Sequence, residues 1–386
     1  MSNRRHIPTS PIYSSACVQA LEQQYCSSCS AAVVSSALVS SHGFGARLVS
    51  RIYNGGRQAV YTATVGAMLV NNVLPAYGEV ISVAAGTTST NLVASSGTNI
   101  EVYGQTQQTT VYTSGQEIIF DGGVASGTTM HGSGSQVVSA GGVAKDTITL
   151  GSFVTSESWV FPTVDVYGKT SGTQLSGGIE NVFAGGEANN TSLIGVTVHN
   201  ESGNGNYRAH GEQYIYSGAV ANSTAIDHGG QYVFAGGIAN HTQLVGANYG
   251  GWQWVESGGV VNDTLVTNSG STQHVSSGAI ANRTTVSDKG EAVVSEGGVA
   301  NQVIVNSDGI LYVKEGAKVY DVQQNSGGIL RVSFGGNDGT VITGTNISGH
   351  TFSLSNGVAR DFTLDHGYLV ASDGGVVKDA TAYASG

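Results

Sequence analysis

The chain has 386 residues, a net charge of −11 and 57 glycines but only 4 prolines, and 40% of its residues are hydrophobic. This hydrophobic content is too high for a disordered linker, and collagen would need glycine at every third position together with abundant proline. An acidic chain without a cluster of Lys and Arg is not built to bind nucleic acid, and no apolar run reaches the about 18 residues of a transmembrane helix. A β-rich repeat protein is the class that remains.

Residues 1–51 form a segment that shares no repeat with the rest of the chain. It holds all three cysteines, Cys17, Cys26 and Cys29. Cys26 and Cys29 are spaced as a C-x-x-C pair, but no second pair is present to complete a zinc site, so we expect no metal or redox role. A basic start followed by the small apolar stretch 31–39 is typical of a leader. We therefore interpret this non-repeat segment as a leader or as a truncated start.

Residues 52–386 repeat with a period of about 19 residues, with slips and two longer excursions at 152–170 and 197–211. Looking for such a period comes first because it defines repeat architectures. The clearest pair is 284–302 and 303–321, in which Val286, Gly290, Val294, Gly297 and Ala300 return 19 positions later as Val305, Gly309, Val313, Gly316 and Val319.

Within each repeat, apolar residues alternate over short runs that end at glycine. Ala292 and Val294 are two apart, so they point to the same side of a strand. Val and Thr dominate the runs, as β-branched residues do in strands, and glycine permits the positive φ of a sharp corner. We expect Val294 to lie inside, between its equivalents Val275 and Val313, with Glu291 on the opposite side.

Short strands separated by turns, locked to a period of about 19, predict one coil per repeat. Successive coils then stack about 4.8 Å apart, and each strand pairs with its counterpart one repeat later. The sequence therefore predicts an all-β fold, a right-handed parallel β-helix (β-solenoid) of roughly 17 coils over residues 52–386.

The repeat also resembles a known family. Residues 257–305 follow the pattern S-G-G-x-A-x-x-T-x-V-x-x-G-G-x-x-x-V, which is similar to the passenger repeat of AIDA-type autotransporter adhesins of Gram-negative bacteria. The resemblance covers roughly residues 52–386 and implies a protein of the cell surface or outer membrane, or a secreted one. It implies adhesion, autoaggregation and biofilm formation, through self-association or host-surface glycans and proteins.

The same resemblance implies O-glycosylation by a heptosyltransferase and export through a C-terminal barrel. The barrel translocator is absent from this chain, so a truncated, non-functional passenger fragment is an alternative. The resemblance implies O-glycan acceptors at serines that precede Gly-Gly or Gly-Ala, whereas the alternative is that these serines only form turns. They are Ser176, Ser217, Ser257 and Ser277.

Four asparagines fall at one repeat position within N-x-[ST] sequences. Since inheritance of the repeat explains their spacing, we expect a stacked ladder that satisfies corner backbone groups in preference to N-glycan sites. They are Asn222, Asn240, Asn262 and Asn282.

Trp252 and Trp254 are two apart and should share one face of a strand. Facing outward, they are candidate surface contacts that could stack on sugars; the alternative is a bulky cap over a corner insertion.

An enzymatic reading, as a polysaccharide-acting β-helix, would need carboxylates gathered on one face. The aspartates of the repeats are instead scattered at corner positions, and the ten histidines are dispersed. The segment GGNDGT at 335–340 occurs once, whereas calcium-binding solenoids repeat such a loop. We therefore expect no catalytic, cofactor-binding or metal-binding residue. The scattered acids are Asp263, Asp288, Asp308 and Asp321.

Overall fold

The computed structural model describes residues 33–41, 46–54, 57–65, 79–155, 158–199, 206–246 and 250–383. The chain divides into two compact units, residues 1–74 and 75–386. In the first unit, β1 (Val33–Ser41), β2 (Ala46–Asn54) and β3 (Arg57–Val65) form an antiparallel sheet. The three cysteines lie outside the described residues. The boundary at residue 52 that the repeats indicate stays a prediction; the first described strand of the second unit begins at Val80.

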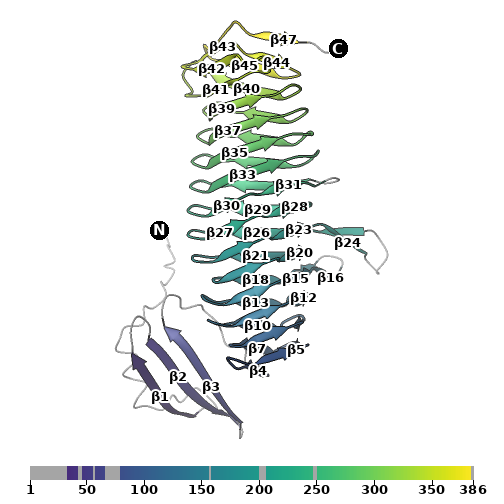
Figure 1. Ribbon diagram of the computed structural model, residues 1–386, viewed down its shortest axis with the longest axis vertical. Helices are drawn as coiled ribbons and strands as arrows, with labels where there is room; N and C mark the ends of the chain where they lie inside the picture. The colour runs from purple at the N-terminus through teal and green to yellow at the C-terminus, as the bar shows by residue number, and fades with distance from the viewer. Residues whose placement is uncertain are drawn as a thin grey trace, which may run out of the picture. The chain divides into compact units, whose positions relative to one another are not determined.

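The second unit is a parallel β-solenoid of about 15 turns that follow one another at a spacing of about 19 residues, which confirms the predicted fold class (Figure 1). One side of every turn belongs to a parallel 14-stranded sheet, called sheet 1 here. Its strands are β4 (Val80–Val83), β7 (Asn99–Val102), β10 (Gln116–Ile119), β13 (Ser135–Val138), β18 (Thr163–Val166), β21 (Gly178–Val182), β26 (Gly211–Ile215), β29 (Gly229–Val233), β32 (Gly251–Val255), β34 (Thr272–Val275), β36 (Glu291–Val294), β38 (Ile310–Val313), β40 (Ile329–Gly335) and β45 (Tyr368–Ser372).

The rest of each turn belongs to a 24-stranded sheet, called sheet 2 here. Early turns contribute two short strands each: β5 (Thr88–Thr90), β6 (Val93–Ala94), β8 (Gln105–Gln107), β9 (Thr110–Val111), β11 (Val124–Ser126), β12 (Thr129–His131), β14 (Val143–Lys145), β15 (Ile148–Leu150), β19 (Lys169–Ser171), β20 (Gln174–Ser176), β22 (Glu187–Asn189), β23 (Ser192–Ile194), β27 (Val220–Asn222), β28 (Ala225–Ile226), β30 (Ile238–Asn240) and β31 (Gln243–Leu244). Later turns contribute one longer strand: β33 (Val260–Val266), β35 (Ile280–Val286), β37 (Val299–Val305), β39 (Lys318–Gln324) and β41 (Val341–Thr345).

At three places the chain contains inserted residues that do not add a full turn to the solenoid. Two are antiparallel hairpins, β16 (Ser152–Thr155) with β17 (Ser158–Val160), and β24 (Val196–His199) with β25 (Asn206–Ala209). They match the two excursions in the repeat. The third is the antiparallel run from β41 through β42 (Thr351–Ser355) to β43 (Val358–Arg360), before β44 (Thr363–Asp365), β46 (Val376–Lys378) and β47 (Thr381–Tyr383).

The estimate of roughly 17 coils was therefore too high, because it divided the whole length from residue 52 by the period. Strand β3 belongs to the antiparallel sheet of the first unit, and the hairpins add residues at corners. Insertions at corners leave the stack intact because parallel pairing resumes with the next strand of sheet 1, as in the pairing of β21 with β26 across the second hairpin.

The interior is built from ladders of equivalent residues. Val294 pairs in register with Val275 on one side and Val313 on the other, and it is 1% exposed, as predicted. Glu291 begins the same strand on the outward side. Fully burying a Val side chain stabilises a fold by about 1.5–3 kcal/mol, and each turn repeats such burials.

The corner between the two sheet 2 segments has a left-handed backbone in turn after turn. At this corner φ lies near +55 to +60° at Asn190, Ser223, His241, Asp263 and Arg283, none of which is glycine. The conformation costs about 1 kcal/mol per residue, but it turns the N–H along the solenoid axis. The His241 N–H donates to the Asn262 carbonyl of the next turn at 2.9 Å. Because the backbone makes this bond, the side chain at the corner is free to vary.

Val294→Asp should lower the free energy of unfolding by more than about 3 kcal/mol, because it places a carboxylate among apolar ladders without a partner. Glu291→Lys, on the outward side of the same strand, should change it by less than about 0.5 kcal/mol. Urea unfolding followed by circular dichroism measures both. Equal effects would contradict the register.

Candidate functional site

An asparagine ladder runs along the outer face of sheet 2. Six asparagines stack turn upon turn, and each side-chain amide donates to the amide oxygen of the preceding one at 2.9–3.0 Å. The predicted ladder is thus confirmed, but it satisfies itself from side chain to side chain, and the corner backbone groups bond elsewhere. The members are Asn189, Asn222, Asn240, Asn262, Asn282 and Asn301.

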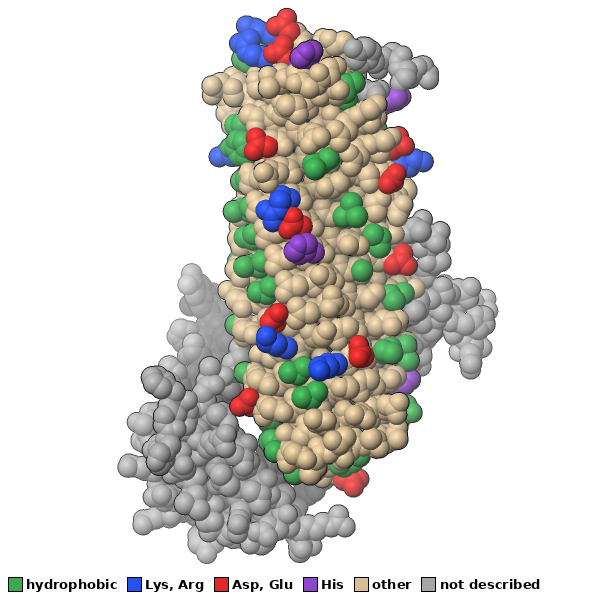
Figure 2. Space-filling model, viewed as in Figure 1, with side chains coloured by type: hydrophobic (Ala, Val, Ile, Leu, Met, Phe, Trp, Pro, Cys, Tyr) green, Lys and Arg blue, Asp and Glu red, His purple; other side chains and the backbone are tan. Residues whose placement is uncertain are grey.

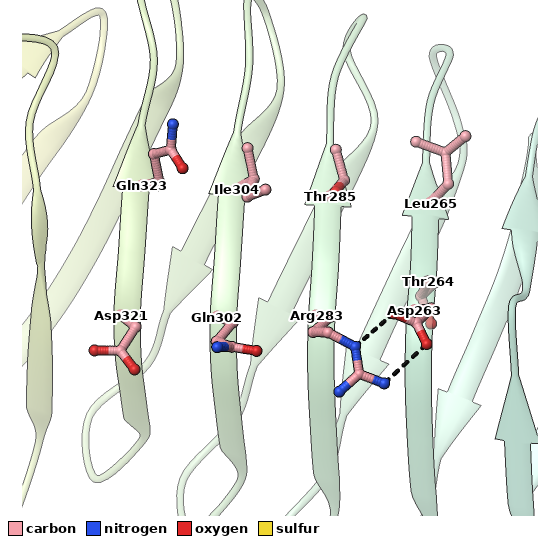
Figure 3. Close-up of a pocket in the computed structure, with 9 residues that line it drawn as sticks. All are labelled: Asp263, Thr264, Leu265, Arg283, Thr285, Gln302, Ile304, Asp321 and Gln323. Atoms are coloured by element: carbon pink, nitrogen blue, oxygen red, sulfur yellow. Dashed lines mark hydrogen bonds and ion pairs between the residues drawn. The ribbon is translucent and has the colours of Figure 1, made fainter.

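Beside this ladder an open groove of about 590 Å³ crosses four consecutive turns (Figure 3). One wall carries the corner residues and the other carries the outward residues two positions later. The corner wall contains an ion pair in which the Arg283 guanidinium donates to Asp263 Oδ1 at 2.5 Å and to Oδ2 at 2.8 Å. The lining residues are Asp263, Thr264, Leu265, Arg283, Thr285, Gln302, Ile304, Asp321 and Gln323.

The ion pair extends over three turns, since His241 Nε2 lies 3.6 Å from Asp263 Oδ2 on the other side. The hydrogen bonds from Arg283 hold the pKa of Asp263 below its usual range. The groove therefore offers an anionic and a cationic side chain that already satisfy each other, together with the amides of Gln302 and Gln323. This chemistry suits polar contacts better than acid–base catalysis.

A column of aliphatic side chains lies among these polar ones on the outer face of sheet 2. Ile238 and Ile280 are each 37% exposed and stand in one outward ladder with Val260 between them. In Figure 2, the visible face of the solenoid is mostly uncharged polar side chains and backbone, with charged groups scattered or in small clusters.

Trp252 and Trp254 both point outward from β32, whose residues alternate between buried and accessible. The Trp254 indole is 36% exposed and stacks on the His274 ring at 3.9 Å. Burial lowers the pKa of His274, which favours the neutral ring at physiological pH. The Trp252 indole N–H donates to the Tyr232 hydroxyl at 3.0 Å. At least one face of the Trp254 ring is therefore already covered.

Trp252 has room because Gly230 stands in the same register of the preceding turn. A Cβ on Gly230 would lie 2.1 Å from the Trp252 indole nitrogen. The glycine is thus required for close packing by an aromatic side chain, not for its backbone conformation.

A second aromatic column on sheet 1 was not predicted from the sequence. Tyr167, Phe183, Tyr216 and Phe234 stack along the axis with ring centroids 4.7, 5.0 and 5.2 Å apart. Such pairs contribute about 0.5–1.5 kcal/mol beyond the area they bury. The available signal was an aromatic residue directly after the inward Val or Ile that closes each of the four strands β18, β21, β26 and β29.

Beside this column, Tyr214 stacks on Tyr232 at 4.9 Å, and its hydroxyl donates to Glu212 at 2.6 Å. Burial and then the Glu212 carboxylate raise the pKa of Tyr214. A hydrogen bond from His210 lowers the pKa of Glu212. Sheet 1 thus presents stacked ring edges bordered by a paired carboxylate.

Three of the four candidate acceptor serines share one position. Ser217, Ser257 and Ser277 are exposed at the tight turn that follows a strand of sheet 1. Each hydroxyl lies against a glycine of the next turn, where a Cβ would approach it to 2.4–2.6 Å. The turn therefore holds the serine hydroxyl at the surface and keeps the neighbouring turn free of a side chain.

Ser176 differs from the other three in its burial and in its place in the coil. It is 3% exposed and ends β20 in sheet 2, directly before β21 of the next turn. In this turn the tight turn after the sheet 1 strand is Tyr167–Gly168, so Ser176-Gly177-Gly178 lies at a different corner. The three-letter pattern is the same but the place in the coil is not.

The acidic residues remain distributed over corners. Asp263 and Asp321 lie at one corner, three turns apart, whereas Asp288 and Asp308 lie at another. Asp338 of the 335–340 loop caps its own turn by accepting from the Gly335 and Thr340 N–H groups. Within the described ranges, no group of three His, Cys, Asp or Glu side chains is placed to hold a metal ion.

None of the described residues forms a helix long and apolar enough to cross a membrane.

Gly230→Ala should displace the Trp252 indole from the Tyr232 hydroxyl, because the new methyl group and the indole nitrogen would occupy the same space. The loss of the hydrogen bond should cost about 1 kcal/mol. With Trp159 and Trp254 replaced by Phe, the fluorescence of Trp252 should shift to the red. An unchanged spectrum would show that the indole does not lie over Gly230.

No family model matches the chain, and a search of curated protein sequences found no match. Among solved structures, the chain is similar to the crystal structure of a hyper-glycosylated fragment of TibA, residues 55–350, whose glycosylation is catalysed by TibC. The two share 26% identity and a TM-score of 0.57, over 80% of this chain and 93% of that one. That fragment is an AIDA-type autotransporter passenger. The resemblance drawn from the repeats is thereby confirmed, and the chain is a β-solenoid similar to an AIDA-type autotransporter passenger.

Proposed function

We propose that the chain acts as an adhesin passenger at the surface of a Gram-negative cell or in a secreted form. The observation that carries the proposal is its likeness to the TibA passenger fragment over 80% of its length. In this role it mediates cell adhesion, autoaggregation and biofilm formation by contact with like passengers or with host-surface glycans and proteins. It does so without catalysis.

The outer face of sheet 2 supports a distributed mode of contact. Its asparagine ladder crosses six turns, its groove crosses four, and outward aliphatic side chains stand at one position of successive turns. One polar contact contributes only about 0.5–1.5 kcal/mol. Several turns that engage together multiply these weak contacts through effective concentration.

Removing whole turns should therefore weaken cell aggregation in steps. The deletions are residues 291–309 for one turn and 291–328 for two, which keep the register of sheet 1 because Glu291, Ile310 and Ile329 are equivalent. The chain is displayed on an outer-membrane barrel, and the settling of cells is measured.

Asp263→Ala serves as the matched point change within the groove. Its settling rate should stay within about twofold of the parent, because a single contact is a small part of the total. Complete loss of settling by this variant, with β-type circular dichroism retained, would instead indicate one discrete site.

The same likeness supports glycosylation of the exposed turn serines by a heptosyltransferase, since the TibA fragment is hyper-glycosylated through TibC. Ser217, Ser257 and Ser277 are exposed and lie at one position of the coil, so an enzyme that recognises one of these turns meets the same geometry at the others.

Co-expression with a heptosyltransferase tests this assignment. Each of Ser217→Ala, Ser257→Ala and Ser277→Ala should remove one sugar from the intact mass. Ser176→Ala is the control and should leave the mass gain unchanged, because its hydroxyl is buried. Equal losses from all four would mean that modification precedes folding.

A further inference from the structure

A ladder of polar side chains runs through the core of the solenoid, on the inward side of sheet 1. Each glutamine amide donates to the side-chain oxygen one turn earlier at 2.7–2.8 Å, and the ladder ends on a carboxylate. Each glutamine oxygen also accepts from a threonine that follows the corner of its own turn, at 3.0–3.2 Å. In order the members are Glu180, Gln213, Gln231, Gln253 and Gln273, all at most 1% exposed.

Glu180 begins the ladder, since the residue in register with it in the preceding turn is apolar. That residue is Val164. A glutamine at this position would have no side-chain amide oxygen in the preceding turn to donate to, whereas a carboxyl group has no amide hydrogens to satisfy. Glu117 stands in the same situation, with Ile100 before it and Gln136 donating to it at 2.8 Å.

The two oxygens of Glu180 have different surroundings. Oε2 accepts from Gln213 Nε2 at 2.7 Å and from the Thr191 hydroxyl at 2.9 Å, which fills both lone pairs. Oε1 accepts from the Thr170 hydroxyl at 2.9 Å and from no amide. Since a hydroxyl can accept as well as donate, Oε1 is the oxygen that can carry a proton and donate it to Thr170.

The same division recurs at Glu117. There Oε2 takes the bonds from Thr128 and Gln136, and Oε1 faces only the Thr106 hydroxyl, at 3.0 Å. Two independent turns thus hold a glutamate with one filled oxygen and one oxygen facing a hydroxyl.

No opposite charge balances Glu180. The side chains that face it are neutral: Thr170, Thr173, Thr191, Gln213 and Val164. Among the buried described residues, Glu117 is the one other carboxyl group, and it lies three turns away in sheet 1. An ionised carboxylate in such surroundings carries a large desolvation cost. Burial raises the pKa of Glu180, and the bonds from Gln213, Thr191 and Thr170 oppose the rise.

We propose that Glu180 is a proton-binding site inside the folded solenoid, held as the neutral acid with its proton on Oε1 and donated to Thr170. The unfolded chain releases this proton at the ordinary pKa of a glutamate, near 4.5. Folding therefore takes up a proton above that pH. The stability that Glu180 contributes is complete below the unfolded pKa and is lost as pH rises through the folded pKa.

The test compares the wild type with Glu180→Gln, which extends the glutamine ladder by one member. Urea midpoints are measured at about pH 5 and about pH 8, a range in which the linkage acts. The wild-type midpoint should fall over this range by more than that of Glu180→Gln. Glu296→Gln, an exposed glutamate, is the matched control and should follow the wild type. Identical pH dependence of all three chains would overturn the proposal.

Infrared spectroscopy gives a second readout that does not depend on the variant folding. A protonated carboxyl group has a C=O band separate from that of a carboxylate. At neutral pH this band should be present in Glu117→Gln and absent from the double variant that combines Glu117→Gln with Glu180→Gln. If Glu180→Gln does not fold, the band in Glu117→Gln decides. Its absence there would show that Glu180 is ionised in the folded chain.

Discussion

The in-register pairing of parallel strands between successive turns is the interaction on which the rest of the structure depends. Each residue of sheet 1 faces its equivalent one turn later, as Val275, Val294 and Val313 do. Neighbouring strands lie about 4.8 Å apart, so each side chain contacts the side chain at the equivalent position of the next turn. The fold is therefore stable only where each position suits stacking on its own kind.

This constraint explains why so many different side chains form ladders in one molecule. Asparagine stacks on asparagine outside sheet 2, and aromatic rings stack outside sheet 1. Amides are suited to such stacking because each donates to one neighbour and accepts from the other. A planar ring does the same with its two faces.

After the turn of Gln273 the core changes from polar to apolar, and two positions change together. Gln273 is followed in register by Ala292, and Thr284 is followed by Val303. The glutamine oxygen is the acceptor for the threonine hydroxyl of its turn. Losing only one partner would leave a buried polar group unsatisfied, at a cost of about 1–3 kcal/mol. At this step the two positions are exchanged as a pair, whereas the turns of Ile100 and Val164 combine an apolar residue with a buried threonine, Thr109 and Thr173.

The sequence predicts most of this architecture because the constraint acts at each turn. The period placed Val294 inside and stacked Asn222 on its equivalents, and both are found. The period alone could not tell a coil from an inserted hairpin, so the number of turns was overestimated. It also could not tell which corner Ser176 occupies, because the same small residues serve both corners.

The buried carboxyl group was missed for a different reason. Acids were expected at solvated corners, which suits Asp308 but not Glu180. The alternation was sufficient to find it: in GIENV the inward Val182 and Glu180 have the same parity. What the alternation does not supply is the partner, since Thr191 and Gln213 come from the next sheet and the next turn. The burial of Glu180 can be derived from its own strand sequence, whereas the hydrogen bonds that make this burial tolerable cannot.

Inward side chains determine the stability of the fold, whereas outward side chains determine the chemistry of the surface. Inward residues must match their equivalents, but the corner backbone bonds along the axis whichever side chain it carries, as at Ser223 and His241. Outward and corner positions can therefore change charge, as from His241 to Asp263 to Arg283, without loss of the stack. The backbone of this surface therefore repeats from turn to turn while its side chains can vary. Such a surface suits a protein that binds through many weak contacts.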